Sequence, residues 1–243
     1  FEEIHHEHQL TFRLTWSTSE AFGFVATGEL LNHGQNSVEL SLVTGLQNIL
    51  PANTPRAIQE SSSNLVDAYK RSELDAETGL WLYTLYSAIS DRAQANESLR
   101  ANTAFCLGLD HAQTLISNDQ LQQFVMNERL SATSERKGVR GLHLTHARIT
   151  LAMNQDQSWD LVADTQSTQS QIIALKAYLQ DPAALRQMIH QDVELGSREL
   201  ARLVAGSDGL QTSGEEAVTV HHYANVLFNI MRGGTFIDHG LIT

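Results

Sequence analysis

Residues 47–71 gather the side chains of this sequence whose chemistry is easiest to interpret. The segment offers planar amide and guanidinium donors, an ammonium group and an aromatic ring, in Arg56, Gln59, Asn64, Tyr69, Lys70 and Arg71. Planar donors and aromatic faces are the groups that hold polar, hydroxyl-rich ligands such as sugars. Pro51 and Pro55 prevent regular strand pairing, and a long connection inside a compact domain is commonly functional. We interpret the six residues as candidates for carbohydrate contact or for a domain interface, and we favour the interface.

Two histidine clusters contain residue types that can bind a metal ion. In a strand, His6 and His8 would share one face, which suits zinc, but no later His or Cys follows at a recognisable ligand spacing. In a helix, His221 and His222 point about 100° apart and cannot chelate one ion together. We therefore expect no metal site, and we expect no cofactor.

The sequence contains no complete catalytic motif. A nucleophile elbow, a phosphate-binding loop, a dinucleotide fingerprint and a His-Glu-x-x-His zinc motif are all absent from it. Glu73, Asp75 and Glu77 cluster, but a glycosidase needs two carboxyl groups across a sugar cleft, which this spacing does not establish. We interpret the three acids as a solvated turn and expect no catalytic centre in this chain alone.

Composition narrows the classes of partner. The chain has 243 residues, 42% of them hydrophobic, and 28 acidic against 16 basic side chains give a net charge of −12. Such an acidic protein repels phosphate backbones and anionic lipid, so we expect no nucleic-acid and no membrane partner. The single cysteine, Cys106, lies in an apolar run and is interpreted as a small buried hydrophobe.

The elements that must position these groups are strands in the first two thirds of the chain. Apolar residues alternate with polar ones from Leu10 to Trp16, the period of a half-buried strand. Similar patterns predict strands at residues 22–31, 38–42, 65–69, 80–86, 98–109, 143–153 and 159–163, and a short helix at 119–127. Close strand–turn–strand spacing indicates antiparallel meanders.

After Asp164 the period becomes helical. Apolar residues recur at three- and four-residue spacing at 172–189 and 195–204, and Pro182 suits a helix start. Residues 206–209 should break this helix, and a last helix is predicted at 215–231 and should end at Gly233 and Gly234. We predict a β domain over residues 1–165 and a helical linker over 166–243. Because the chain begins and ends within such patterns, we expect it to be a piece of a longer protein.

Three segments resemble a known enzyme family: GLQNILP at 45–51, NLVDAYKRSEL at 64–74 and HYANVLFNIMRGG at 222–234. They are similar to the N-terminal region of glycoside hydrolase family 94 enzymes, related to cellobiose phosphorylase and especially to 1,2-β-oligoglucan phosphorylases. The resemblance implies a mainly β fold with an α-helical C-terminal segment: an antiparallel β-supersandwich of the galactose mutarotase-like type, followed by linker helices. An (α/α)6 catalytic barrel would begin after Thr243.

For function, the resemblance implies a non-catalytic accessory domain of a larger, inverting phosphorylase acting on β-glucosides. Its expected partners are the oligosaccharide substrate, its own barrel domain and a second copy in a homodimer, and its expected compartment is the cytoplasm. Two alternatives remain open. One is a stand-alone aldose mutarotase-like epimerase using His143 or His146 with a distant Glu; the other is a purely structural module that associates through apolar helix faces.

Overall fold

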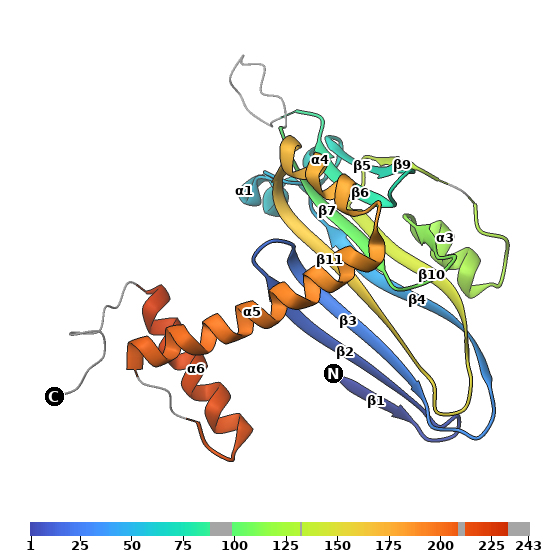
Figure 1. Ribbon diagram of the computed structural model, residues 1–243. Coiled ribbons are helices and arrows are strands. Elements are labelled where there is room, and N and C mark those ends of the chain that lie inside the picture. Colours follow the sequence, from blue (N-terminus) through green and yellow to red (C-terminus); the bar gives the residue numbers. More distant parts are fainter. Residues whose placement is uncertain (88–98, 132, 209–211, 233–243) are drawn as a thin grey trace. The chain divides into compact units, whose positions relative to one another are not determined.

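The computed structural model describes residues 1–87, 99–131, 133–208 and 212–232 (Figure 1). Antiparallel strands dominate up to Thr168 and helices follow, which confirms the prediction of a mainly β protein with C-terminal helices. The chain divides into two compact units, residues 1–189 and 190–243. The division lies later than the predicted boundary at 165, because α4 (Gln169–Tyr178) packs on β11 within the first unit.

The larger sheet, sheet A, has eight antiparallel strands in the spatial order β1-β2-β3-β11-β7-β6-β5-β9. In that order they are β1 (Glu2–His5), β2 (Leu10–Ser19), β3 (Gly23–Asn32), β11 (Asp156–Thr168), β7 (Arg100–Leu107), β6 (Leu80–Leu85), β5 (Lys70–Asp75) and β9 (Glu135–Lys137). The strands β1, β2 and β3 form an antiparallel meander, and β11 joins it to the remaining strands by pairing with both β3 and β7. The strand predicted at 38–42 is not part of this meander.

The smaller sheet, sheet B, has three strands in the order β4-β10-β8, namely β4 (Val38–Ile49), β10 (Gly141–Leu151) and β8 (Gln113–Leu115). Helix α3 (Asn118–Val125) packs on it through Leu121 and Phe124, which contact the cluster of Leu115, Leu142 and Leu144. Ser117 caps this helix in a reciprocal arrangement with Gln120, so the helix begins slightly before the predicted Asp119.

The core lies between the two sheets. Trp81, Tyr83, Ala104 and Ile116 form a fully buried cluster, and the Tyr83 hydroxyl donates to the carbonyl of Leu142 on β10 at 3.2 Å. Trp159 of β11 lies under β4, where its indole N–H donates to the Thr44 hydroxyl at 3.3 Å. Its ring occupies the space over Gly28, where a Cβ would stand 2.3 Å from the indole, so only glycine fits at this point of β3.

The opposite face of sheet A carries helices. Lys176 of α4 pairs with Asp75 at 2.8 Å, and Arg186, in the first turns of α5 (Pro182–Asp208), pairs with the buried Asp160 of β11 at 2.6 Å. Phe22 meets Tyr178 of α4 edge to face, with ring centroids 6.4 Å apart. The first unit is therefore layered as helices, sheet A, sheet B and α3.

The second unit contains the rest of α5 and α6 (Glu216–Met231). One residue from each helix, Val204 and Val226, is buried. Several large apolar side chains of this unit remain exposed: Leu195, Leu200, Leu203, Val218, Val220, Phe228 and Met231.

Two local predictions were wrong. Residues 65–69 do not form a strand, because α2 (Ser63–Asp67) includes the first three of them and follows α1 (Arg56–Ser61) directly. His6 and His8, which would share a face in a strand, lie in a turn after β1. Helix α5 continues through Gly206 to Asp208. The expected helix end at Gly233 and Gly234 falls outside the described residues.

Candidate functional site

The six predicted site residues are distributed over two short helices and the start of β5. Arg56 is exposed on α1, where it pairs with Glu60 one turn later at 2.8 Å, and Asn64 is exposed on α2. The structure joins Gln59 to Lys70 by a hydrogen bond and places Arg71 apart from them, beside the ring of Tyr86. It does not bring all six into one site.

Lys70 is enclosed by the helical segment that precedes it. Its ammonium group donates to Gln59 Oε1 at 2.6 Å and to Asp67 Oδ1 at 2.7 Å, and only 1% of the side chain is exposed. Buried charges are held by partners of this kind because desolvation without them is costly. The network joins α1 and α2 to the sheet.

Arg71 belongs to a different group, which we name the Arg71–Tyr86 cluster: Arg71, Glu73, Tyr86, Glu135 and Lys137. The guanidinium group of Arg71 pairs with Glu73 and with Glu135, each at 2.6 Å, and its central carbon lies 5.4 Å from the Tyr86 ring centroid. Lys137 pairs with Glu135 at 3.2 Å and lies 5.6 Å from the same ring. Two cations, two anions and one aromatic ring thus share a surface.

Strand pairing explains how residues so distant in sequence meet. In the β5–β9 register Arg71 lies opposite Lys137, and in the β5–β6 register it lies opposite Thr84. The Tyr86 N–H donates to the carbonyl of Tyr69 at 2.9 Å, which extends this ladder beyond β6 and places the two tyrosine backbones side by side. Tyr86, Glu135 and Lys137 are not predicted as site residues from the sequence, because pairing with β9 leaves no signal near residue 71.

The positive and negative charges of the Arg71–Tyr86 cluster neutralise one another. The hydrogen bond with Arg71 holds the pKa of Glu135 below its usual value, and the hydrogen bond with Tyr86 is the main cause that raises the pKa of Lys137. Burial opposes the charged form of Arg71, but its contacts with Glu135 and Glu73 outweigh this and raise its pKa. The charges therefore cancel at neutral pH, and Tyr86 remains 47% exposed. Such a surface suits a neutral, hydroxyl-rich ligand better than an ion.

A small polar pocket lies near the other side of β9. It has a volume of about 190 Å³ and is lined by Gln47, Asn48, Asn118, Arg136 and Arg140, among others. Arg136 lies opposite Ser72 in the strand register, so the pocket and the Arg71–Tyr86 cluster flank the same edge of sheet A. Amide and guanidinium groups are therefore concentrated at this edge.

Neither histidine considered for an epimerase hydrogen-bonds to an acid among the described residues. His143 is buried, and its Nε2 atom lies 3.5 Å from the Thr145 hydroxyl. The Nε2 atom of His146 lies 3.0 Å from the Ser41 hydroxyl, and its ring centroid lies 5.1 Å from that of Phe124. In residues 1–87, 99–131, 133–208 and 212–232 no carboxylate hydrogen-bonds to either ring.

His143 should instead make stability depend on pH. Burial lowers its pKa to about 4, whereas the unfolded chain titrates near 6.5. Below that pH the unfolded state binds a proton that the folded state does not, so stability falls as the pH decreases from 6.5 towards 4. We expect the titration of His143 to lower the free energy of unfolding by about 2 kcal/mol as the pH falls from 8 to 5.

Urea unfolding of the wild-type chain and of His143→Gln at both pH values measures this contribution as the difference between the two pH dependences. The carboxylates titrate alike in the two proteins, so their contributions to the pH dependence cancel in the difference. Equal pH dependences in both proteins would contradict the assignment.

No three His, Cys, Asp or Glu side chains of the described residues are grouped as a metal ion would require. Burial raises the pKa of the Cys106 thiol to about 11, which leaves it unreactive at neutral pH. No helix in the described part of the chain is long and apolar enough to cross a membrane. Comparison of the chain with protein-family models and with curated proteins finds no match.

Proposed function

We propose that this chain is a non-catalytic accessory domain of a larger carbohydrate-active enzyme, and that it contacts the oligosaccharide through the Arg71–Tyr86 cluster. The whole enzyme would be an inverting phosphorylase of β-glucosides in glycoside hydrolase family 94, working in the cytoplasm. Its catalytic (α/α)6 barrel would be supplied by chain outside these residues.

One observation carries the proposal. The Arg71–Tyr86 cluster combines an open aromatic face with guanidinium, ammonium and carboxylate groups whose charges cancel. Sugar hydroxyls both donate and accept hydrogen bonds, so a ligand of this class can use the donors and the carboxylate oxygens together. The ion pairs hold the side chains in place before a ligand arrives, which reduces the entropy lost on binding.

Calorimetric titration with short β-linked gluco-oligosaccharides tests the proposal. We expect saturable binding without turnover, and we expect Arg71→Ala and Tyr86→Ala each to weaken it about tenfold, which corresponds to about 1.4 kcal/mol. A glucose mutarotation assay on the same sample should give the uncatalysed rate.

Arg56→Ala is the matched control, because Arg56 is also an arginine paired with a glutamate but lies on α1, outside the cluster. Its affinity should equal that of the wild-type chain. Equal losses in Arg56→Ala and Arg71→Ala would contradict a site at the cluster, and catalysed mutarotation would favour the epimerase.

The structural module has separate support in the second unit. The exposed apolar residues of α5 and α6 given above suit an interface with the barrel domain or with a second copy in a homodimer. Absence of sugar binding, together with self-association at micromolar concentration in light scattering, would favour this candidate over the carbohydrate-contact function.

A further inference from the structure

Sheet B covers only part of sheet A. Its outermost strand, β4, lies over β11, as the Trp159–Thr44 hydrogen bond establishes, and sheet A continues past β11 through β3, β2 and β1. Neighbouring strands are spaced about 4.8 Å apart, so about 14 Å of sheet A extends beyond the edge of sheet B.

Exposure increases along the rows of residues that cross these strands. Leu161 of β11, Ala26 of β3 and Trp16 of β2 lie opposite one another on one face, and their exposed fractions are 4%, 2% and 55%. In the next row Ala163 lies opposite Phe24, which is 50% exposed. The cover on this face therefore ends between β3 and β2 in the first row and between β11 and β3 in the second.

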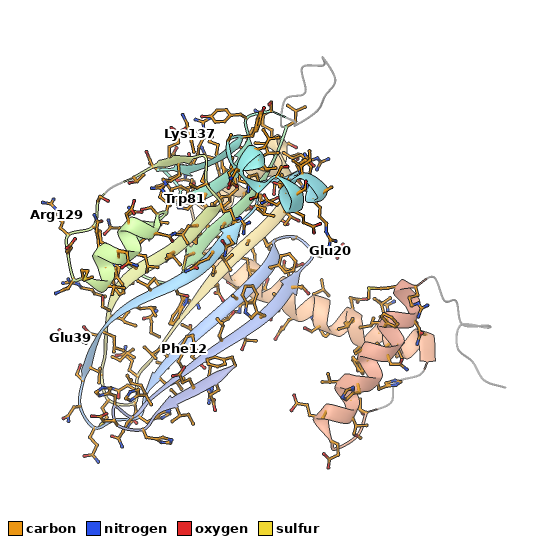
Figure 2. The ribbon with its side chains drawn as sticks, turned by 180° about the vertical axis from the view of Figure 1, so that it is seen from behind. Phe12, Glu20, Glu39, Trp81, Arg129 and Lys137 are labelled. Atoms are coloured by element: carbon orange, nitrogen blue, oxygen red, sulfur yellow. The ribbon has the colours of Figure 1, made fainter. Side chains whose placement is uncertain are left out.

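An aromatic row crosses the same boundary. Trp159 is buried and stacks on Phe12 with ring centroids 6.2 Å apart, and Phe12 meets the exposed Phe1 edge to face at 6.2 Å. We name Phe1, Phe12, Leu14, Trp16 and Phe24 the uncovered face. Figure 2 labels Phe12 on this part of sheet A, far from Lys137 on β9 and thus from the Arg71–Tyr86 cluster.

The edge of sheet B beside the uncovered face is open as well. β4 is 12 residues long, contains one charged residue, Glu39, and pairs only with β10 among the described residues. None of its backbone groups bonds to any other described segment. A long edge strand with so little charge is a template for pairing with another strand.

The N-terminal strands are mainly acidic, although Arg148 of β10 lies opposite Ser41 of β4. Residues 1–49 contain six glutamates and no aspartate or lysine, and their single arginine, Arg13, is already paired with Glu2 and Glu29. A segment that docks here gains from basic side chains on its solvent face.

The space rules out β4–β4 pairing with a second copy. If β4 paired antiparallel with β4 of a second copy about a twofold axis, the two copies of sheet B would form one continuous sheet. Both copies of sheet A would then lie on the same face of that sheet. Each sheet A extends three strands beyond its β4, so the two would occupy the same volume. Only separate strands, without a second sheet attached behind them, fit over the uncovered face.

We propose that the free edge of β4 and the uncovered face bind an extended peptide segment that alternates apolar with basic residues. The segment pairs with β4 as a further strand of sheet B, its apolar side chains cover Phe12, Leu14 and Trp16, and its basic side chains face solvent on the side of Glu39. This is β-strand addition, in which backbone bonds provide affinity and alternate side chains provide selectivity.

Trp16 reports on the site directly. The chain has three tryptophans, and Trp81 and Trp159 are fully buried, so quenching by acrylamide acts on Trp16. The probe is a twelve-residue peptide alternating valine with lysine. A peptide of the same composition with its valines in one block carries the same charge but cannot present one apolar face as a strand.

We expect the alternating peptide to shift the Trp16 emission to shorter wavelength, to protect it from acrylamide, and to bind at least about tenfold more tightly than the block peptide. Leu42→Lys, on β4, and Phe24→Lys, on the uncovered face, should each abolish this preference. Met126→Lys, at an exposed apolar residue after α3, is the matched control and should retain it. Circular dichroism confirms that each variant is folded.

Equal binding of the two peptides, or an unchanged preference in both Leu42→Lys and Phe24→Lys, would overturn the proposal. Two other results would reassign the surface: concentration-dependent protection of Trp16 without peptide would assign it to a second copy, and protection by β-gluco-oligosaccharides would assign it to sugar. Because the Arg71–Tyr86 cluster lies on different strands, its variants and these can fail independently.

Discussion

Arg186→Met is expected to lower the free energy of unfolding by about 3–5 kcal/mol, because it removes the countercharge of a buried carboxylate. Asp160 is fully buried on β11, and its Oδ2 atom accepts from Arg186 Nε at 2.6 Å, while its Oδ1 atom accepts from the Thr27 hydroxyl at 2.6 Å. The Thr27 hydroxyl, which also bonds to Asp160, is neutral. Urea unfolding at pH 7, followed by circular dichroism, measures the loss.

Two further variants separate charge from packing. Arg202→Met lies on the same helix, where Arg202 is exposed and pairs with Glu199 at 3.3 Å, and should change stability by less than about 0.5 kcal/mol. The double variant Asp160→Asn/Arg186→Met should recover most of the loss, since no charge remains buried. If the double variant is as unstable as Arg186→Met, the packing of the arginine and not its charge holds α5 to sheet A.

Asp67→Ala is expected to lower the free energy of unfolding by a similar amount, about 3–5 kcal/mol, because it leaves a buried positive charge without its carboxylate. The Lys70 ammonium would keep only the neutral Gln59 amide as a partner and would remain almost completely buried. Because this network joins α1 and α2 to β5, we also expect faster proteolysis within residues 56–67. Chemical denaturation and limited digestion of the folded protein measure the two effects.

Lys70→Met is the informative comparison. It leaves the carboxylate of Asp67, whose side chain is 27% exposed, able to hydrate, so the loss should be only about 1 kcal/mol. A greater loss in Lys70→Met than in Asp67→Ala would show that the lysine stem, and not the charge pair, stabilises the segment. Either result separates Lys70 from Arg71, which is its neighbour in sequence but lies in the Arg71–Tyr86 cluster.

Local patterns in the sequence were sufficient to identify most of the secondary structure. Alternation of apolar and polar residues predicted β2, β3 and β10, and three- and four-residue spacing predicted α5 and α6, because each pattern reflects which side chains of one element face the core. The pattern at residues 65–69 wrongly predicted a strand, because a few apolar residues do not distinguish a short helix from a strand.

The candidate site was predicted only in part, because it depends on contacts between distant residues. The sequence alone determined that residues 47–71 hold donors and an aromatic ring, and that no complete catalytic motif accompanies them. Only the tertiary structure decided that Lys70 is buried against Asp67, and that β9 brings Glu135 and Lys137 to Arg71. It likewise decided that sheet B ends at β4 and leaves Trp16 exposed. Side-chain periodicity is a local property of the chain, whereas strand order and burial arise from pairing between segments far apart in sequence, and no local pattern records that pairing.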